Sequence, residues 1–277
     1  MLGVVLLVAA GTASVSLQGE AVGEFERLYD SYAGPPSFDH YLQYGRRYEA
    51  HLPPRRGSGT LRLLEIGVQS GGSSRVWREF YGKRLYYVGV DINRLTVSLA
   101  LPRQRTFIEV GSAANASFLS AVCAKHGPFD VIVDDGAHTA KLIRASLTIL
   151  FPQSSCLREG GYYVIEDTHT MAKCKNRFSS QAGFCHTFMD IASLAAEAFI
   201  GQHRNWFRSG SWPSNKELGM AEPLGKWASH ISEMHTYDSQ LFLKRGAIAR
   251  LTRFQRGSVH IPYFADAADK ETTRAGN

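Results

Sequence analysis

Two acidic motifs each follow an apolar run of the kind that forms a buried β-strand. The first is Asp-Asp-Gly-Ala-His at 134–138, and the second is Glu-Asp-Thr-His-Thr at 166–170. In a doubly wound sheet these strands are neighbours, so both motifs lie at the carboxyl edge, where ligands bind. Four carboxylates at one edge repel one another unless a cation neutralises them, and oxygen ligands of this kind suit Mg²⁺. The two motifs therefore predict a bound Mg²⁺ ion.

His138, which ends the first motif, is the candidate general base, because an imidazole exchanges protons near neutral pH. A plain loop histidine is the alternative. Asp134 opens the same motif and is assigned no metal role. An acid at its position caps the following loop or holds a cofactor, and we predict that it contacts the cofactor.

A glycine-rich loop, Glu-Ile-Gly-Val-Gln-Ser-Gly-Gly-Ser at 65–73, follows the first predicted strand. Glycines at a strand-to-helix turn let a ligand approach the backbone amides. The second strand ends in Asp91, where a carboxylate can accept both hydroxyls of a ribose. The chain has neither G-x-G-x-x-G nor G-x-x-x-x-G-K-[ST], which argues against a dinucleotide or a nucleoside triphosphate.

The acid before this loop suits the ammonium and sulfonium end of S-adenosylmethionine (SAM), which is positively charged. We therefore predict SAM as the cofactor, with Asp91 on its ribose. The loop residues expected to contact the cofactor are Glu65, Gly67, Gln69, Ser70, Gly71 and Ser73. A glycine-rich turn that binds nothing is the alternative.

Short apolar runs alternate with helical periodicity from residue 61 onward, which predicts parallel strands joined by right-handed crossovers. The predicted strands are 61–68, 85–91, 106–110, 129–133 and 161–165, the last after a Gly-Gly turn, and the helices are 75–81, 116–126 and 139–151. Segments 231–238 and 240–244 form a tight antiparallel pair. The predicted fold is a doubly wound, Rossmann-like α/β sheet of seven strands, mostly parallel with an antiparallel last strand and helices on both faces.

The chain divides around this sheet. The α/β domain is expected to span 61–250, with a helix at 187–201 and an insertion or lid at about 202–225 that is rich in Trp, Gly, Ser and Pro. An N-terminal helical region at 17–60 precedes it, with helices at 25–32 and 41–51, and a polar tail at 251–277 follows it.

The first sixteen residues form an apolar run followed by small residues, a pattern typical of a signal peptide. The run is too short for a stable membrane span. A lumen of the secretory pathway is therefore one expected location, and the cytoplasm is the alternative.

Composition narrows the class of partner. The formal net charge is +6, but the basic residues come in short pairs without interleaved aromatics, which disfavours nucleic acid. None of the four cysteines has the C-x-x-C spacing of a zinc ribbon or a thioredoxin motif. Cys174 and Cys185 are expected to be free thiols or one local disulfide rather than metal ligands.

The segment 61–244 resembles the metal-dependent sugar O-methyltransferases of macrolide biosynthesis, of the macrocin and mycinamicin type. The stretches that carry the resemblance are EIGVQSGGSS, YYVGVDIN, DDGAH, GGYYVIEDTHT and HTYDSQLFLKRG. The resemblance implies that Asp135, Glu166 and Asp167 bind Mg²⁺ and that His138 is the base.

The chain departs from this family at two places. The family usually has Gly-Asp-Gln after the third strand, whereas this chain has Gly-Ser-Ala at 111–113, and we expect Ser112 to contact the cofactor there. The family's Ser-Tyr after the second acidic motif is replaced by Met-Ala at 171–172.

The predicted activity is SAM-dependent and Mg²⁺-dependent O-methylation of a small-molecule acceptor, a sugar or glycoside. No nucleic-acid partner and no stable membrane span are expected, and a homo-oligomer is a candidate assembly. Three alternatives stay open: a metal-independent N- or O-methyltransferase, a non-catalytic cofactor-binding module, and an oxidative enzyme of the cephalosporin hydroxylase kind. The last is disfavoured because no two-His-one-carboxylate spacing is recognisable.

Overall fold

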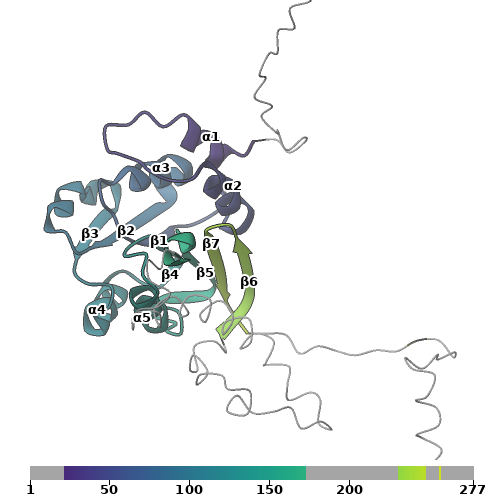
Figure 1. The fold of residues 1–277 in the computed structure, drawn as a ribbon. Coiled ribbons are helices and arrows are strands. Elements are labelled where there is room, and N and C mark those ends of the chain that lie inside the picture. Colours follow the sequence, from purple (N-terminus) through teal and green to yellow (C-terminus); the bar gives the residue numbers. More distant parts are fainter. Residues whose placement is uncertain (1–21, 173–229, 248–255, 257–277) are drawn as a thin grey trace, which may run out of the picture.

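A computed structural model of the chain describes residues 22–172, 230–247 and 256. Within them, helices cover both faces of a seven-stranded sheet (Figure 1). The strands are β1 (Leu61–Ile66), β2 (Leu85–Asp91), β3 (Thr106–Val110), β4 (Phe129–Asp134), β5 (Leu157–Ile165), β6 (Ile231–Tyr237) and β7 (Gln240–Arg245). The helices are α1 (Glu24–Asp30), α2 (Leu42–His51), α3 (Gly72–Tyr81), α4 (Ala116–His126) and α5 (Ala140–Leu150). Short 3₁₀ turns occur at Gly82–Arg84, Arg94–Leu99, Pro102–Gln104 and Thr168–Ala172.

The strand order confirms the predicted fold class. The order is β3-β2-β1-β4-β5-β7-β6, and β1 to β5 pair in parallel. β7 lies antiparallel to both of its neighbours, β5 and β6. β6 therefore runs in the same direction as β5, and β7 is the one reversed strand, as expected for residues 240–244.

Each face of the sheet has its own apolar core, because each covering helix is amphipathic. On one face, Ile143, Leu147 and Leu150 of α5 recur at helical spacing and pack with α4. On the other face, α1, α2 and α3 contribute mostly aromatic side chains, among them Tyr48 and Trp77, whose rings are 4.9 Å apart. The N-terminal helices thus form part of the fold that holds the sheet.

Two boundaries differ most from the prediction, and glycine accounts for both. β5 begins at Leu157, four residues before the predicted 161, and runs through the glycine pair as an irregular strand with a register shift against β4. Gly160 has a φ of +79°, which accommodates this bulge. α3 begins at Gly72, directly after Gly71 in the left-handed region, instead of at 75.

A disulfide joins Cys123 of α4 to Cys156, just before β5, and both residues lie in the apolar core. The sequence did not indicate this pairing. Several predicted features lie outside the described residues, namely the leader, Cys174 and Cys185, the helix at 187–201, the insertion at 202–225 and most of the tail. In the described part of the chain, no helix has the length and apolar character needed to cross a membrane.

Candidate functional site

The sheet brings the glycine-rich loop and both acidic motifs to one edge. Ile66, the last residue of β1, is in register with Val90 of β2 and with Asp134 of β4, and Asp134 is in register with Ile165 of β5. The segments that follow these strands therefore start at the same level. Gly67 has a φ of +91°, and a Cβ there would lie 2.2 Å from the carbonyl oxygen of Asp135. This glycine thus lets the loop pack directly against the first acidic motif.

A cavity of about 520 Å³ opens at this edge. Of the predicted site residues, those that line it are Gly67, Gln69, Ser73, Asp91, Ser112, Asp135, His138 and Asp167. Residues 37–40, which precede α2 and belong to no strand, form another part of the wall. One cavity therefore holds the predicted cofactor loop, the predicted base and two of the predicted metal ligands.

Asp91 ties the glycine-rich loop to the end of β2. Its Oδ2 accepts hydrogen bonds from the backbone N–H groups of Val68 (2.9 Å) and Gln69 (3.0 Å), and its Oδ1 accepts one from Asn93 (2.8 Å). A carboxylate has about four acceptor sites, so one remains for a ligand hydroxyl. Asp91 therefore orders the loop in addition to facing the cavity.

Glu65 lies behind the cavity wall, where it is buried. Its Oε2 accepts hydrogen bonds from the hydroxyls of Ser73 (2.9 Å) and Tyr87, and its Oε1 has no hydrogen-bond partner among the described residues. Burial raises the pKa of this carboxyl to about 7. A buried acid with an unused oxygen beside the glycine-rich loop fits the cationic end of SAM.

Three other residues that were predicted to contact the cofactor lie outside the cavity lining. Ser70 is exposed at the turn, and Gly71 supplies the left-handed residue before α3. Asp134 is buried, and its Oδ2 accepts hydrogen bonds from the hydroxyls of Tyr163 (2.7 Å) and Ser146. None of these three residues lines the cavity, and the carboxylate of Asp134 joins β4 to β5 and α5 instead.

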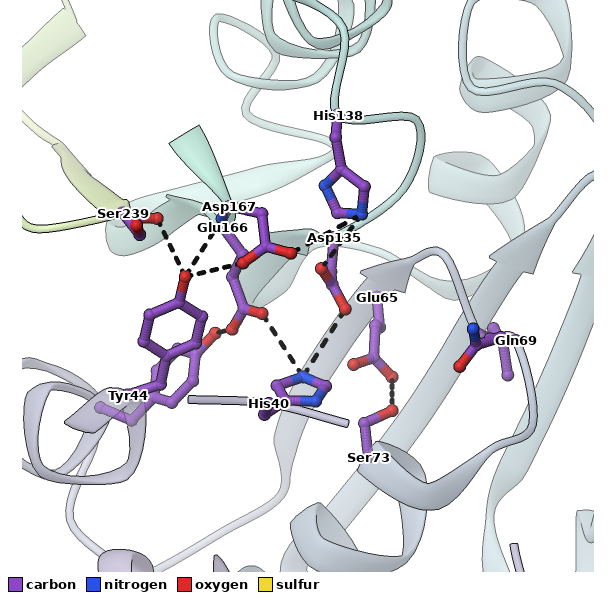
Figure 2. Close-up of polar contacts among 12 residues, drawn as sticks. His40, Tyr44, Glu65, Gln69, Ser73, Asp135, His138, Glu166, Asp167 and Ser239 are labelled. Carbon is purple, nitrogen blue, oxygen red and sulfur yellow. Dashed lines mark hydrogen bonds and ion pairs between the residues drawn. The ribbon is translucent and has the colours of Figure 1, made fainter. Parts of the chain in front are cut away.

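Asp135, Asp167 and His138 converge at the cavity wall (Figure 2). The Nε2 atom of His138 lies 3.8 Å from Oδ1 of Asp135 and 3.9 Å from Oδ2 of Asp167. His138 and Asp167 have positive φ values, 47° and 52°, which are unfavourable for residues with a Cβ. Such strain persists where the surrounding structure fixes it, and it is concentrated at functional sites.

Glu166 completes the acidic group from a deeper position, where it is buried beside Tyr48 of α2, whose hydroxyl donates to Oε1. Tyr44 of the same helix donates its hydroxyl to Oδ1 of Asp167 at 2.8 Å. The two tyrosines are one helical turn apart, so a single face of α2 orients both members of the Glu-Asp pair.

The electrostatics of the group call for a cation. Burial raises the pKa of Asp135 and of Glu166 well above the usual values, and the negative charge of neighbouring Asp167 adds to both shifts. Within the described ranges, the basic groups within 4 Å of the three carboxylates are the imidazoles of His40 and His138. Carboxylate oxygens gathered in this way have the donor chemistry of a Mg²⁺ site. The residues therefore fit the predicted ion.

His40 was not found by sequence reasoning. Its Nε2 lies 3.4 Å from Oε2 of Glu166 and 3.6 Å from Oδ2 of Asp135. In the sequence it is an isolated histidine more than ninety residues before the first acidic motif, with no spacing that ties it to either carboxylate. Tyr44 and Tyr48 lie in the helix predicted at 41–51, to which the sequence assigned no site role.

The described strands, with one reversed strand between two parallel neighbours, form the Rossmann-like fold of class I SAM-dependent methyltransferases. No family model matches the chain. L-olivosyl-oleandolide 3-O-methyltransferase of Streptomyces antibioticus is 38% identical over 133 residues, which cover 44% of this chain and 32% of that enzyme. Demethylmacrocin O-methyltransferase of Streptomyces fradiae is 36% identical over 130 residues, with 44% and 31% covered. The matched segment spans about one third of these relatives.

A solved structure gives a longer match. The MycE methyltransferase of the mycinamycin biosynthetic pathway, in complex with Mg, SAH and mycinamycin VI, superimposes with a TM-score of 0.64 and 25% identity. The match covers 90% of this chain and 59% of that one. These comparisons confirm the predicted resemblance to sugar O-methyltransferases of macrolide pathways.

Proposed function

We propose that this chain is a SAM-dependent O-methyltransferase that uses Mg²⁺ and acts on a hydroxyl of a sugar or glycoside. The observation that carries the proposal is the shared cavity, in which the glycine-rich loop and Asp91 face Asp135, Asp167 and His138. The similarity to enzymes named for sugar O-methylation supports a small-molecule acceptor rather than a nucleic acid. A homo-oligomer stays a prediction, to be checked by light scattering.

Each residue has a distinct task in this proposal. Asp135, Glu166 and Asp167 would hold the metal ion, which would supply a Lewis acid for the acceptor hydroxyl. His138 takes the hydroxyl proton onto Nε2, which faces the carboxylates of Asp135 and Asp167 at 3.8 and 3.9 Å. The glycine-rich loop and Asp91 would hold SAM, which would supply the methyl group to the acceptor oxygen and leave as S-adenosylhomocysteine. Alignment of these groups contributes a large part of the rate enhancement.

The test is methyl transfer from labelled SAM to a panel of glycosides, before and after removal of divalent metal with a chelator. We expect activity to vanish in the chelator and to return when Mg²⁺ is restored. Glu166→Ala should abolish most activity and leave SAM binding nearly intact, because Glu166 does not line the cavity that the glycine-rich loop faces. His138→Ala should lower turnover about 10²- to 10⁴-fold, the range for a lost general base.

Glu109→Ala is the matched control. This acid lies on β3, next to β2, and forms hydrogen bonds with Lys125 and His126. It does not line the cavity. Activity should therefore survive its loss. Full turnover in excess chelator would contradict the metal role and favour a metal-independent methyltransferase.

A further inference from the structure

His40 reaches the acidic group from outside the sheet. It lies just before α2, and its side chain is only 9% exposed. Its ring stacks on that of Phe38, with centroids 4.6 Å apart and planes 12° from parallel. Figure 2 shows the imidazole facing Glu166 and Asp135 from the side opposite His138. The two histidines therefore bracket the carboxylates.

The distances suit ligands of one ion better than a direct hydrogen bond. The Nε2 atom is 3.4 Å from Glu166 Oε2 and 3.6 Å from Asp135 Oδ2, whereas N–H···O hydrogen bonds are usually about 2.7–3.2 Å long. Two ligand atoms about 2.1–2.2 Å from one ion are separated by about 3.0–3.6 Å at angles between octahedral and tetrahedral. The atoms of His40, Asp135 and Glu166 all lie within 4.8 Å of one another.

The surroundings of the ring agree with this geometry. The stacking on Phe38 holds the ring in place, and its Nε2 faces the carboxylates of Asp135 and Glu166. Its Nδ1 is buried and has no hydrogen-bond partner within the described residues. An imidazole nitrogen that faces two carboxylates has the donor chemistry of a ligand if a cation lies between them.

We propose that His40 is a direct ligand of the metal ion through Nε2, beside Asp135 and Glu166. This inference deepens the proposed function, since it adds a nitrogen ligand to the metal site on which that function rests. Imidazole favours first-row transition ions, whereas Mg²⁺ prefers an all-oxygen shell. The site of this chain should therefore bind Mn²⁺ more tightly than Mg²⁺, and His40 should account for most of the difference.

The experiment uses Mn²⁺ alone as the probe, bound to the full chain without SAM or acceptor. Electron spin-echo envelope modulation detects ¹⁴N nuclei bonded to Mn²⁺. We expect nitrogen modulation in the unchanged protein and in His138→Gln, and its loss in His40→Gln. Competition titrations should show that His40→Gln weakens Mn²⁺ binding about tenfold or more and changes Mg²⁺ binding less.

His138→Gln is the matched control, because it removes an imidazole from the other side of the same carboxylates. Modulation that disappears in His138→Gln, or that is absent from the unchanged protein with Mn²⁺ bound, would overturn the role of His40 and leave the metal site intact. These two measurements decide the question even if His40→Gln does not fold. Absence of both Mn²⁺ and Mg²⁺ binding would instead refute the metal role in the proposed function, and this inference with it.

Discussion

Replacement of Asp91 by alanine tests the cofactor site most directly, because the structure gives this carboxylate two roles. Its three hydrogen bonds from the backbone N–H groups of Val68, Gln69 and Asn93 fix the loop, and a further acceptor site faces the cavity. A hydrogen bond to a charged group contributes about 1.5–3 kcal/mol when shielded from water, and less at a half-exposed position such as this one. Asp91→Ala should therefore act on both folding and binding.

Asp91→Ala should lower both the free energy of unfolding and the affinity for SAM. We expect the free energy of unfolding to fall by about 1–2 kcal/mol, because the loop amides lose their acceptor. SAM binding should weaken by about 2–3 kcal/mol, because bound SAM shields its hydrogen bond to Asp91 from water and because the loop loses its anchor. This loss corresponds to roughly 30- to 150-fold in Kd. Asp91→Asn keeps one oxygen acceptor. Its stability and its affinity for SAM should therefore lie between those of the unchanged protein and of Asp91→Ala.

Isothermal titration calorimetry with SAM measures the binding loss, and urea unfolding measures the stability loss. Glu109→Ala, on the neighbouring strand, is the control for removal of a carboxylate and should leave the affinity for SAM unchanged. Unchanged affinity in Asp91→Ala would place the nucleoside elsewhere and contradict the proposed cofactor role of this loop.

Three further changes test the rest of the architecture. Burial raises the pKa of Glu65 from 4.5 to about 7, so the folded state holds a proton that the unfolded state releases, and this group lowers stability as pH rises through that interval. In Glu65→Gln, the fall in the free energy of unfolding between pH 5 and pH 8, measured with urea, should be smaller by about 3 kcal/mol. The same fall in both proteins would contradict this prediction. Joint replacement of Cys123 and Cys156 by serine should lower the free energy of unfolding by about 3–4 kcal/mol, since the disulfide closes a loop of 33 residues. If iodoacetamide labels both thiols without prior reduction, the disulfide is absent. Gly72→Ala would place a Cβ 2.3 Å from the Ser37 carbonyl oxygen, so it should displace the segment that carries His40 and weaken Mn²⁺ binding in titrations, whereas unaltered binding would show that this contact is dispensable.

The sheet was predictable because its signals are local. The apolar run of β2 ends at Asp91, and the predicted and observed bounds coincide there. The two acidic motifs follow β4 and β5 directly, and parallel pairing alone brings their starts together. The glycine pair at 160–161 misled the prediction of β5, since a short glycine turn and a glycine bulge inside a strand have the same sequence signal.

What the sequence did not indicate depends on contacts between distant segments. Tyr44 reaches Asp167 across 123 positions, and the partners of the disulfide are 33 residues apart without a motif. His40 shares no periodicity with the carboxylates that it faces. For the adjacent acids Asp134 and Asp135, the family resemblance gave the metal role to Asp135 alone, but the sequence did not indicate that Asp134 bonds Tyr163 and Ser146 in the core.

The cavity wall at 37–40 has a consequence for how this protein can be divided. A fragment that starts at Leu61 would contain every described strand and the whole glycine-rich loop, but it would lack His40, both α2 tyrosines and one side of the cavity. The segment that contains all described strands is therefore shorter than the segment that contains the candidate site. In chimeras with a related enzyme, exchange of the first sixty residues would replace His40, the proposed nitrogen ligand, and would leave every described strand unchanged. We therefore expect such an exchange to change the metal preference without altering the sheet.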